Sequence, residues 1–186
     1  MHFSLADLVT DITQNGAESG ADLLELEVKE TVYKEKEEFR FTVRDNGKGM
    51  SPEELKQARD PFYTDGIKHP NRKVGLGLPF LIQTAEHSGG GWELKSEKGK
   101  GTEVSGWFDM GSVDTPPVGD ISGMFRTILL FPGPKEMVIR RSNDIKKINY
   151  ELRKTELEEA IGGLDDTASL LHLNKYLQSI EEVEEG

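Results

Sequence analysis

Several short polar stretches of this 186-residue chain carry side chains that together could bind a ligand. The central one is Asp45-Asn46-Gly47-Lys48-Gly49, directly behind an alternating run, Phe39 to Arg44, that predicts a β-strand. A strand that ends at Asp45 delivers its carboxylate to a loop, where binding groups usually lie. Gly47 and Gly49 then allow the backbone to turn sharply and to approach a flat ligand.

A second pair of polar side chains lies upstream. Asp11 and Asn15 are four residues apart on a predicted amphipathic helix, so they share one face and can point together into a pocket. Solvated polar residues on the outer face of such a helix have the same spacing. The pair therefore supports a site only in combination with the other stretches.

A glycine-rich stretch downstream, Gly75-Leu76-Gly77-Leu78, predicts the start of a helix that runs to about His87. The first backbone N–H groups of a helix are unpaired, and its dipole favours anions there. The residues before it, 60–74, have no periodicity and hold a basic cluster that includes Lys68. Loops of this length are usually functional or disordered.

Two common glycine motifs are excluded. Gly75-x-Gly77 lacks the third glycine of a dinucleotide-binding fingerprint, because position 80 is Phe. The stretch Lys98 to Thr102 lacks the leading glycine of a P-loop and predicts a hairpin turn between strands at 92–96 and 103–108.

Composition narrows the function classes further. A net charge of −11 and a pI near 4.9 argue against nucleic-acid or anionic-membrane binding over the general surface, and no apolar run is long enough to span a bilayer. Without cysteine there is no disulfide and no thiolate zinc site, so a metal would arrive with its ligand. No signal peptide is visible at the start, and we expect a cytoplasmic protein.

The remaining helices and strands are predicted from the spacing of apolar residues and from helix-capping residues. A strand over 24–28 and the strand ending at Arg44 flank a predicted charged hairpin loop, Thr31 to Glu37. A helix starts at Ser51-Pro52-Glu53-Glu54, with Ser51 and Glu54 as a capping box, and ends near Arg59. Residues 112–123 predict a linker. Beyond it we expect strands at 125–131, 136–141 and 147–152, then helices at 155–161 and 165–180.

In this order the first 111 residues resemble the GHKL superfamily of ATP-binding domains, which includes DNA gyrase, the ninety-kilodalton heat-shock chaperone, histidine kinases and MutL. The resemblance is greatest to histidine kinase catalytic domains and anti-sigma-factor serine kinases. It rests on an ordered set of boxes: Asp11 to Asn15, Asp45 to Gly49, Asp60-Pro-Phe62-Tyr-Thr, Val74 to Leu78, and Gly101-Thr102.

The resemblance implies a role for each box. Asp45 would accept a hydrogen bond from the adenine amino group, with Gly47 and Gly49 against the base and Thr102 helping to hold it. Asn15 would give its amide oxygen to Mg²⁺. Phe62 and Lys68 would belong to a lid over the phosphates, with Gly75, Gly77 and Leu78 as its hinge and phosphate-facing end.

The implied fold is α+β: a two-layer GHKL (Bergerat) sandwich over 1–111, a linker over 112–123 and a small α/β appendage over 124–186. The implied function is binding of Mg-ATP or ADP by a kinase-like domain that acts on a separate protein. Asp11 would be the catalytic residue, but the family usually has the longer Glu there, so the carboxylate of Asp11 reaches about one methylene less far for acid–base work. The alternatives are a nucleotide-gated, anti-sigma-like binding module and a conformational ATPase.

Overall fold

The computed structural model describes residues 3–60 and 77–182. Within these residues the chain forms one six-stranded sheet with the strand order β3-β4-β2-β1-β5-β6. The strands are β1 (Leu23–Tyr33), β2 (Lys36–Asp45), β3 (Gly91–Glu97), β4 (Gly101–Asp109), β5 (Glu136–Asn143) and β6 (Ile148–Arg153). The helices are α1 (Leu5–Ala17), α2 (Pro52–Arg59), α3 (Gly77–His87), α4 (Ile121–Leu129), α5 (Lys154–Ile161) and α6 (Thr167–Glu181).

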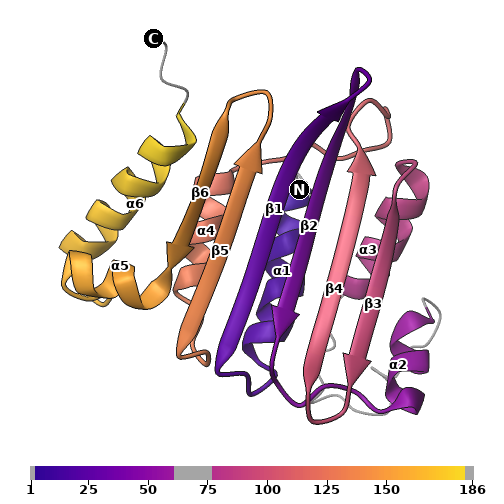
Figure 1. The fold of residues 1–186 in the computed structure, drawn as a ribbon, viewed down its shortest axis with the longest axis horizontal. Coiled ribbons are helices and arrows are strands. Elements are labelled where there is room, and N and C mark those ends of the chain that lie inside the picture. The colour runs from indigo at the N-terminus through magenta and orange to yellow at the C-terminus, as the bar shows by residue number, and fades with distance from the viewer. Residues whose placement is uncertain (1–2, 61–76, 183–186) are drawn as a thin grey trace.

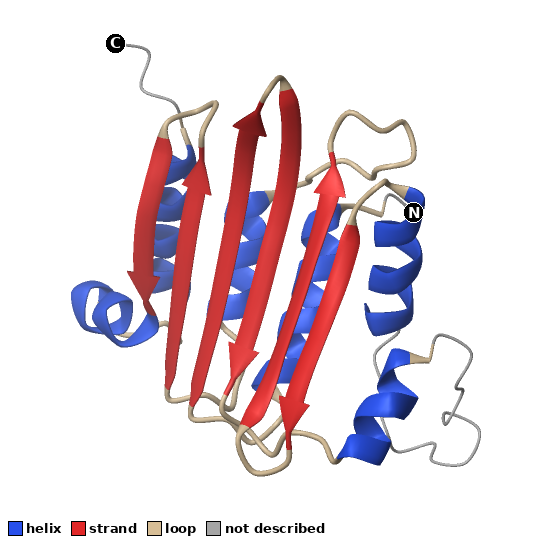
Figure 2. Cartoon of the chain, turned by 45° about the vertical axis from the view of Figure 1, so that its right-hand side comes forward, coloured by secondary structure: helices blue, strands red, loops and turns tan. Residues whose placement is uncertain are grey.

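Helices α1, α3, α4 and α6 form a layer on one face of the sheet (Figures 1 and 2). The core lies between the two layers, because alternate strand residues such as Leu26, Phe41 and Ile139 point toward the helices and are almost fully buried. From the helical side, Leu8 and Phe125 are completely buried against them. The predicted two-layer α+β sandwich is confirmed.

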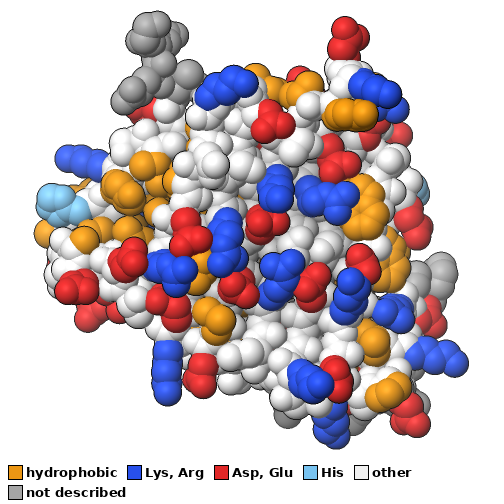
Figure 3. Space-filling view, in the orientation of Figure 1, with side chains coloured by type: hydrophobic (Ala, Val, Ile, Leu, Met, Phe, Trp, Pro, Cys, Tyr) orange, Lys and Arg blue, Asp and Glu red, His pale blue; other side chains and the backbone are white. Residues whose placement is uncertain are grey.

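The other face of the sheet is covered with charged side chains of both signs (Figure 3). Arg44 pairs with Glu103 at 2.8 Å, and Arg140 bridges Glu25 and Glu151 at 3.1 Å each. Such exposed pairs contribute little stability, but they keep this face in water and so fix which side of each strand is buried. None of the described helices has the length and apolar character needed to cross a bilayer.

The loop predicted at 31–37 is wrong in length. Strand β1 continues to Tyr33 and β2 starts at Lys36, so only Lys34 and Glu35 form the turn, with φ of 50° and 67°. Two consecutive residues in the left-handed region give a turn whose twist matches that of the paired strands. The charged residues of this segment therefore lie on a long, exposed hairpin rather than in a loop.

The strand predicted at 125–131 is also wrong, because these residues belong largely to helix α4. A short apolar run fits either a strand or a buried helix. Asp120 decides between them: its Oδ1 accepts the backbone N–H of Gly123 at 3.0 Å, and this N-cap starts the helix. The other predicted elements beyond the linker are confirmed as β5, β6, α5 and α6.

The strands beyond the linker do not form a sheet of their own. Strand β5 pairs in parallel with β1 from Leu23↔Glu136 to Glu30↔Asn143, and β6 then pairs antiparallel with β5. The hydrogen bonds of one continuous sheet thus cross the predicted boundary at 112–123. Figure 1 shows β5 and β6 extending the sheet directly beside β1.

Candidate functional site

The end of strand β2 places Asp45 in the middle of the sheet. The strand pairs with β1 on one side and with β4 on the other, where Asp45 lies opposite Thr102. The next residue, Asn46, accepts the backbone N–H groups of Asp22 and Leu23 at 2.9 and 3.0 Å through Oδ1. These two hydrogen bonds hold the turn that follows Asp45 against the start of β1.

The carboxylate of Asp45 is oriented by hydrogen bonds to one of its oxygens. Oδ1 accepts the backbone N–H of Gly47 at 2.9 Å and lies 3.1 Å from the hydroxyl of Ser19, whose one proton it shares with the carbonyl oxygen of Gly16 at 2.7 Å. Oδ2 lies on the side of Gly16, 3.4 Å from the position that a Cβ there would take. Burial raises the pKa of Asp45, and the hydrogen bonds from Gly47, Ser19 and Thr102 only partly oppose this.

The two glycines after Asp45 are needed because the loop is packed tightly against its neighbours. A Cβ on Gly47 would lie 2.1 Å from Ser19 Oγ, and one on Gly49 would lie 2.0 Å from the carbonyl oxygen of Glu97. Gly49 also has a φ of 64°, which other residues rarely adopt. The loop is therefore pressed between the end of α1 and the β3–β4 hairpin.

Thr102 belongs to a small hydroxyl network at the same end of the sheet. Its Oγ1 lies 2.8 Å from Ser96 Oγ, and Ser96 Oγ donates to the carbonyl oxygen of Gly101 at 3.0 Å. Ser96 Oγ in turn accepts the backbone N–H of Met50 at 2.8 Å. This network links the loop after β2 to both strands of the β3–β4 hairpin and orients Thr102 beside Asp45.

Helix α1 brings Asp11 and Asn15 to the same region, close to the start of α3. A Cβ on Gly77 would lie 3.5 Å from Asp11 Cβ and 3.1 Å from Ile12 Cδ1, so the first residue of α3 packs against α1. Asn15 is half-buried and Asp11 is exposed. Partial burial and the nearby charge of Asp7 raise the pKa of Asp11.

Not every predicted site residue can be placed. Leu78 is half-buried and packs against the core. Phe62, Lys68 and Gly75 lie outside the described residues. In the two described ranges, no cluster of three or more His, Asp or Glu side chains could hold a metal on its own.

Two residues of the site are missing from the sequence prediction. Ser19 orients Asp45, and Ser96 orients Thr102. Neither serine lies in a box with a recognisable spacing, and isolated hydroxyl residues are common in any sequence. Their contribution follows only from the folding of α1 and the β3–β4 hairpin around the end of β2.

A comparison with known proteins finds a family whose model covers the part of the chain that holds the site. The family model described as "Histidine kinase-, DNA gyrase B-, and HSP90-like ATPase" matches residues 3–112, which is more than half of the chain. The CAI-1 autoinducer sensor kinase/phosphatase CqsS of Vibrio cholerae is 34% identical over 105 residues, which are 55% of this chain and 15% of that protein. Sensor protein SrrB of Staphylococcus aureus is 33% identical over 101 residues, 53% of this chain and 16% of that protein.

A shorter match and one solved structure complete the comparison. Sporulation kinase C of Bacillus subtilis is 39% identical over 62 residues, 33% of this chain and 14% of that protein. The topoisomerase IV ATP-binding domain of Francisella tularensis, in complex with a small-molecule inhibitor, is similar at a TM-score of 0.39 with 17% identity, over 80% of this chain and 84% of that one. The chain spans only about a sixth of the length of the curated relatives.

Proposed function

Because this chain belongs to the family of histidine kinase-, DNA gyrase B- and HSP90-like ATPases, we propose that it binds Mg-ATP at the end of strand β2. The observation that carries the proposal is the half-buried carboxylate of Asp45. One of its oxygens is held by Ser19 and Gly47, and the other lies on the side of Gly16, which has no side chain of its own. A fixed acceptor of this kind suits the amino group of adenine.

Base selectivity follows from the same carboxylate. Adenine presents an amino group at the position where guanine presents a carbonyl oxygen. An ionised carboxylate is an acceptor only, so guanine would leave it unpaired and bring two acceptors together. Leaving a partly buried carboxylate without its partner costs more than the hydrogen bond itself contributes.

The phosphates and Mg²⁺ would lie toward α1 and the start of α3. Asn15 is half-buried on the face of α1 that also bears Asp11, and its amide oxygen suits a hard cation. Mg²⁺ keeps most of its octahedron filled with water and phosphate oxygens, so few protein ligands are needed. Gly77 places the first residue of α3 against Asp11, and the first turn of a helix favours anions.

We further propose that the domain is kinase-like and acts on or regulates a separate protein. The similar proteins include sensor kinases and a sporulation kinase, and this supports a role in phosphoryl transfer. The alternative is a nucleotide-gated binding module, which the Asp at position 11 favours because its carboxylate reaches about one methylene less far than that of a Glu. Measured ATP turnover with and without candidate partners separates the two, since a module shows slow or no turnover in both cases.

The adenine pocket is tested by calorimetry with Mg-ATP and Mg-GTP. We expect ATP to bind far more tightly than GTP, and Asp45→Asn to weaken ATP binding by about 1.5–3 kcal/mol, or roughly tenfold to a hundredfold. Asp109→Asn is the matched control, because Asp109 also ends a strand and accepts the N–H of a glycine two residues on, Gly111, at 2.8 Å. Equal affinities for ATP and GTP would remove the assignment.

A further inference from the structure

Helix α1, which carries Asp11 and Asn15, is held at its first turn by the segment that precedes α4. The backbone N–H groups of Leu5 and Ala6 donate to the carbonyl oxygens of Pro117 and Val118 at 2.9 Å each. Gly119 then passes so close that a Cβ on it would lie 2.5 Å from Ser4 Oγ and 2.7 Å from Ser4 Cβ. Pro117 and Val118 therefore bind the first N–H donors of α1, which helices leave unpaired, and Gly119 packs against the N-cap.

The other end of α1 meets the loop between α4 and β5. A Cβ on Gly133 would lie 2.5 Å from the carbonyl oxygen of Ala17, a backbone atom that can move only with the helix. Just beyond, the N–H groups of Lys135 and Glu136 donate to the carbonyl oxygen of Asp22 at 2.9 and 3.0 Å. The contact at Ala17 is two residues from Asn15 and one from Gly16, which faces Asp45.

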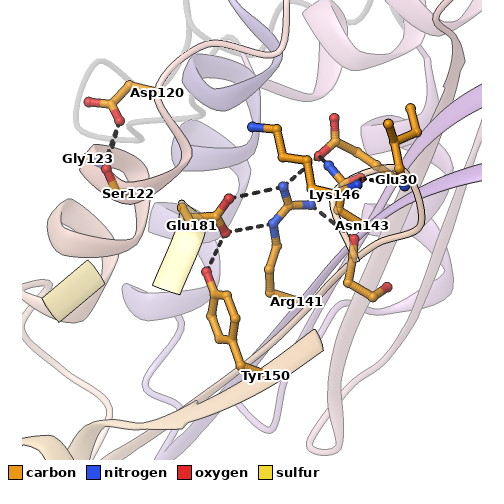
Figure 4. Close-up of polar contacts among 11 residues, drawn as sticks. Glu30, Asp120, Ser122, Gly123, Arg141, Asn143, Lys146, Tyr150 and Glu181 are labelled. Atoms are coloured by element: carbon orange, nitrogen blue, oxygen red, sulfur yellow. Dashed lines mark hydrogen bonds and ion pairs between the residues drawn. The ribbon is translucent and has the colours of Figure 1, made fainter. Parts of the chain in front are cut away.

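Helix α4 joins these two contacts, and it is itself held by α6. Arg126 on α4 donates to Asn174 Oδ1 on α6 at 3.1 Å. The end of α6 is tied to the sheet by Glu181, which pairs with Arg141 Nε at 2.9 Å and accepts the hydroxyl of Tyr150 (Figure 4). The segment from 117 to 181 is therefore a framework that touches both ends of the helix carrying Asn15.

Arg141 is the centre of that framework. Its side chain is only 1% exposed, and it lies between Glu181 and Glu30, with Nη2 2.6 Å from Glu30 Oε2. Burial lowers the pKa of Arg141, but the hydrogen bonds and charges of Glu181 and Glu30 outweigh this and raise it. The guanidinium stays charged and joins α6, β5 and β1.

We propose that Gly119 and Gly133 are positioning residues that set the placement of α1 and, through it, the metal and phosphate part of the nucleotide site. This inference rests on the proposed binding of Mg-ATP. It assigns a role in that binding to the segment beyond residue 112, which lies outside the region matched by the family model, 3–112. A helix is stiff, so a displacement at Ser4 is transmitted over the roughly 16 Å to Asn15. The adenine part depends mainly on β2 and is affected less.

Two substitutions test the link, with two controls matched in backbone conformation. Gly119→Ala and Gly133→Ala each add one methyl group against α1, at φ of 87° and 120°. Gly162→Ala adds the same group at a φ of 86°, close to that of Gly119, and Gly163→Ala adds it at 106°, closer to that of Gly133. Nothing lies within 4 Å of either position, so both controls place a side chain at a positive φ without the contact. A second variant, Gly119→Ala with Ser4→Gly, removes the two nearest atoms that the new methyl group would meet and leaves Ala6 Cβ at 3.3 Å, and Gly is tolerated at an N-cap.

The readout separates the two parts of the site. ATP binding is measured with Mg²⁺ and with EDTA, and the ratio of the two affinities reports the metal-dependent part. We expect Gly119→Ala and Gly133→Ala to reduce this ratio several-fold while binding in EDTA changes little. Adding Ser4→Gly to Gly119→Ala should restore the ratio, and Gly162→Ala and Gly163→Ala should leave the ratio unchanged.

Hydrogen exchange of the amides of residues 5–17 without nucleotide gives an independent measure of α1. Faster exchange in Gly119→Ala and Gly133→Ala, but not in Gly162→Ala or Gly163→Ala, supports the link even if wild-type protein fails to bind ATP, in which case only the proposed function fails. An unchanged ratio and unchanged exchange in both variants would overturn the link. So would an equal loss of affinity with and without Mg²⁺, because that indicates a general loss of structure.

Discussion

At the scale of single residues, the burial of Asp45 has opposite effects on binding and on stability. Because the pKa of Asp45 in the folded protein is raised above the ordinary 3.8, the stability that it contributes is complete below 3.8 and is lost as the pH rises through the raised value. Above that value the ionised carboxylate destabilises the fold, yet it is the form that accepts a hydrogen bond from adenine. Ligand recognition and stability are therefore opposed at this position.

A pH profile of ATP binding checks this. We expect affinity to fall on acidification with a midpoint above 3.8, because protonation removes the acceptor at the raised pKa of Asp45. Asp45→Asn should lose this pH dependence and should unfold with a free energy at least as high as that of the wild type at neutral pH. A profile flat down to pH 4 would contradict the assignment of Asp45 to the adenine.

Ser19 changes the pKa of the Asp45 carboxyl group. Its hydroxyl lowers the pKa of Asp45, so Ser19→Ala should raise that pKa further and move the midpoint of the binding profile to higher pH. At neutral pH we expect a loss of about 1 kcal/mol in ATP affinity, or roughly fivefold. Ser179→Ala is the control, since both hydroxyls donate to a carbonyl oxygen three residues earlier, but Ser179 lies on α6. A midpoint that stays in place in Ser19→Ala would show that Ser19 does not act on Asp45.

At the scale of elements, Ser96 joins the loop after β2 to the β3–β4 hairpin. Ser96→Ala removes the acceptor of the Met50 N–H and the hydroxyl partner of Thr102. We expect it to lower the free energy of unfolding by about 1–3 kcal/mol, because an unsatisfied polar group in a folded protein is costly. ATP affinity should fall with it, by roughly threefold or more.

Ser105→Ala separates these two effects. Ser105 Oγ lies 3.1 Å from Thr42 Oγ1, so it also forms a hydroxyl pair between neighbouring strands, but away from the end of β2. Chemical unfolding should show a similar loss of stability, while calorimetry should show ATP affinity within about twofold of the wild type. Equal losses of ATP affinity in both variants would mean that Ser96 acts only through stability.

At the scale of the whole molecule, one sheet and one helical layer run across the linker, so the segments on either side should unfold together. Arg141→Met leaves the half-buried carboxylates of Glu30 and Glu181 without their buried cation, and we expect a loss of about 3 kcal/mol. The two tryptophans, Trp92 and Trp107, both lie before the linker. Their fluorescence should nevertheless show that Arg141→Met unfolds at a lower urea concentration than the wild type.

The neighbouring arginine provides the control. Arg140 also bridges two glutamates, Glu25 and Glu151, but its side chain is 36% exposed on the open face of the sheet. Arg140→Met should therefore lower the free energy of unfolding by no more than about 1 kcal/mol. A tryptophan transition that is unmoved in Arg141→Met would show that the two segments unfold separately.

The sequence by itself determined the features that depend on near neighbours in the chain. Alternation in β2 and the glycines after it predicted where Asp45 would lie, and a spacing of four residues placed Asp11 and Asn15 on one face of α1. The capping box predicted for α2 is confirmed, because Ser51 and Glu54, which form it, are only three residues apart. The ordered boxes also predicted the family.

Only the tertiary structure decided what depends on distant segments. The N-cap Asp120 starts helix α4 locally, but the burial of the apolar run around Phe125 between α1 and α6 follows only from the packing of the three helices. The hydrogen bonds of Ser19 with Asp45 and of Ser96 with Thr102, and the ion pair of Arg141 with Glu30, join groups that are 6 to 111 residues apart. Backbone pairing of β5 with β1 likewise has no local signal, because any strand offers the same donors and acceptors.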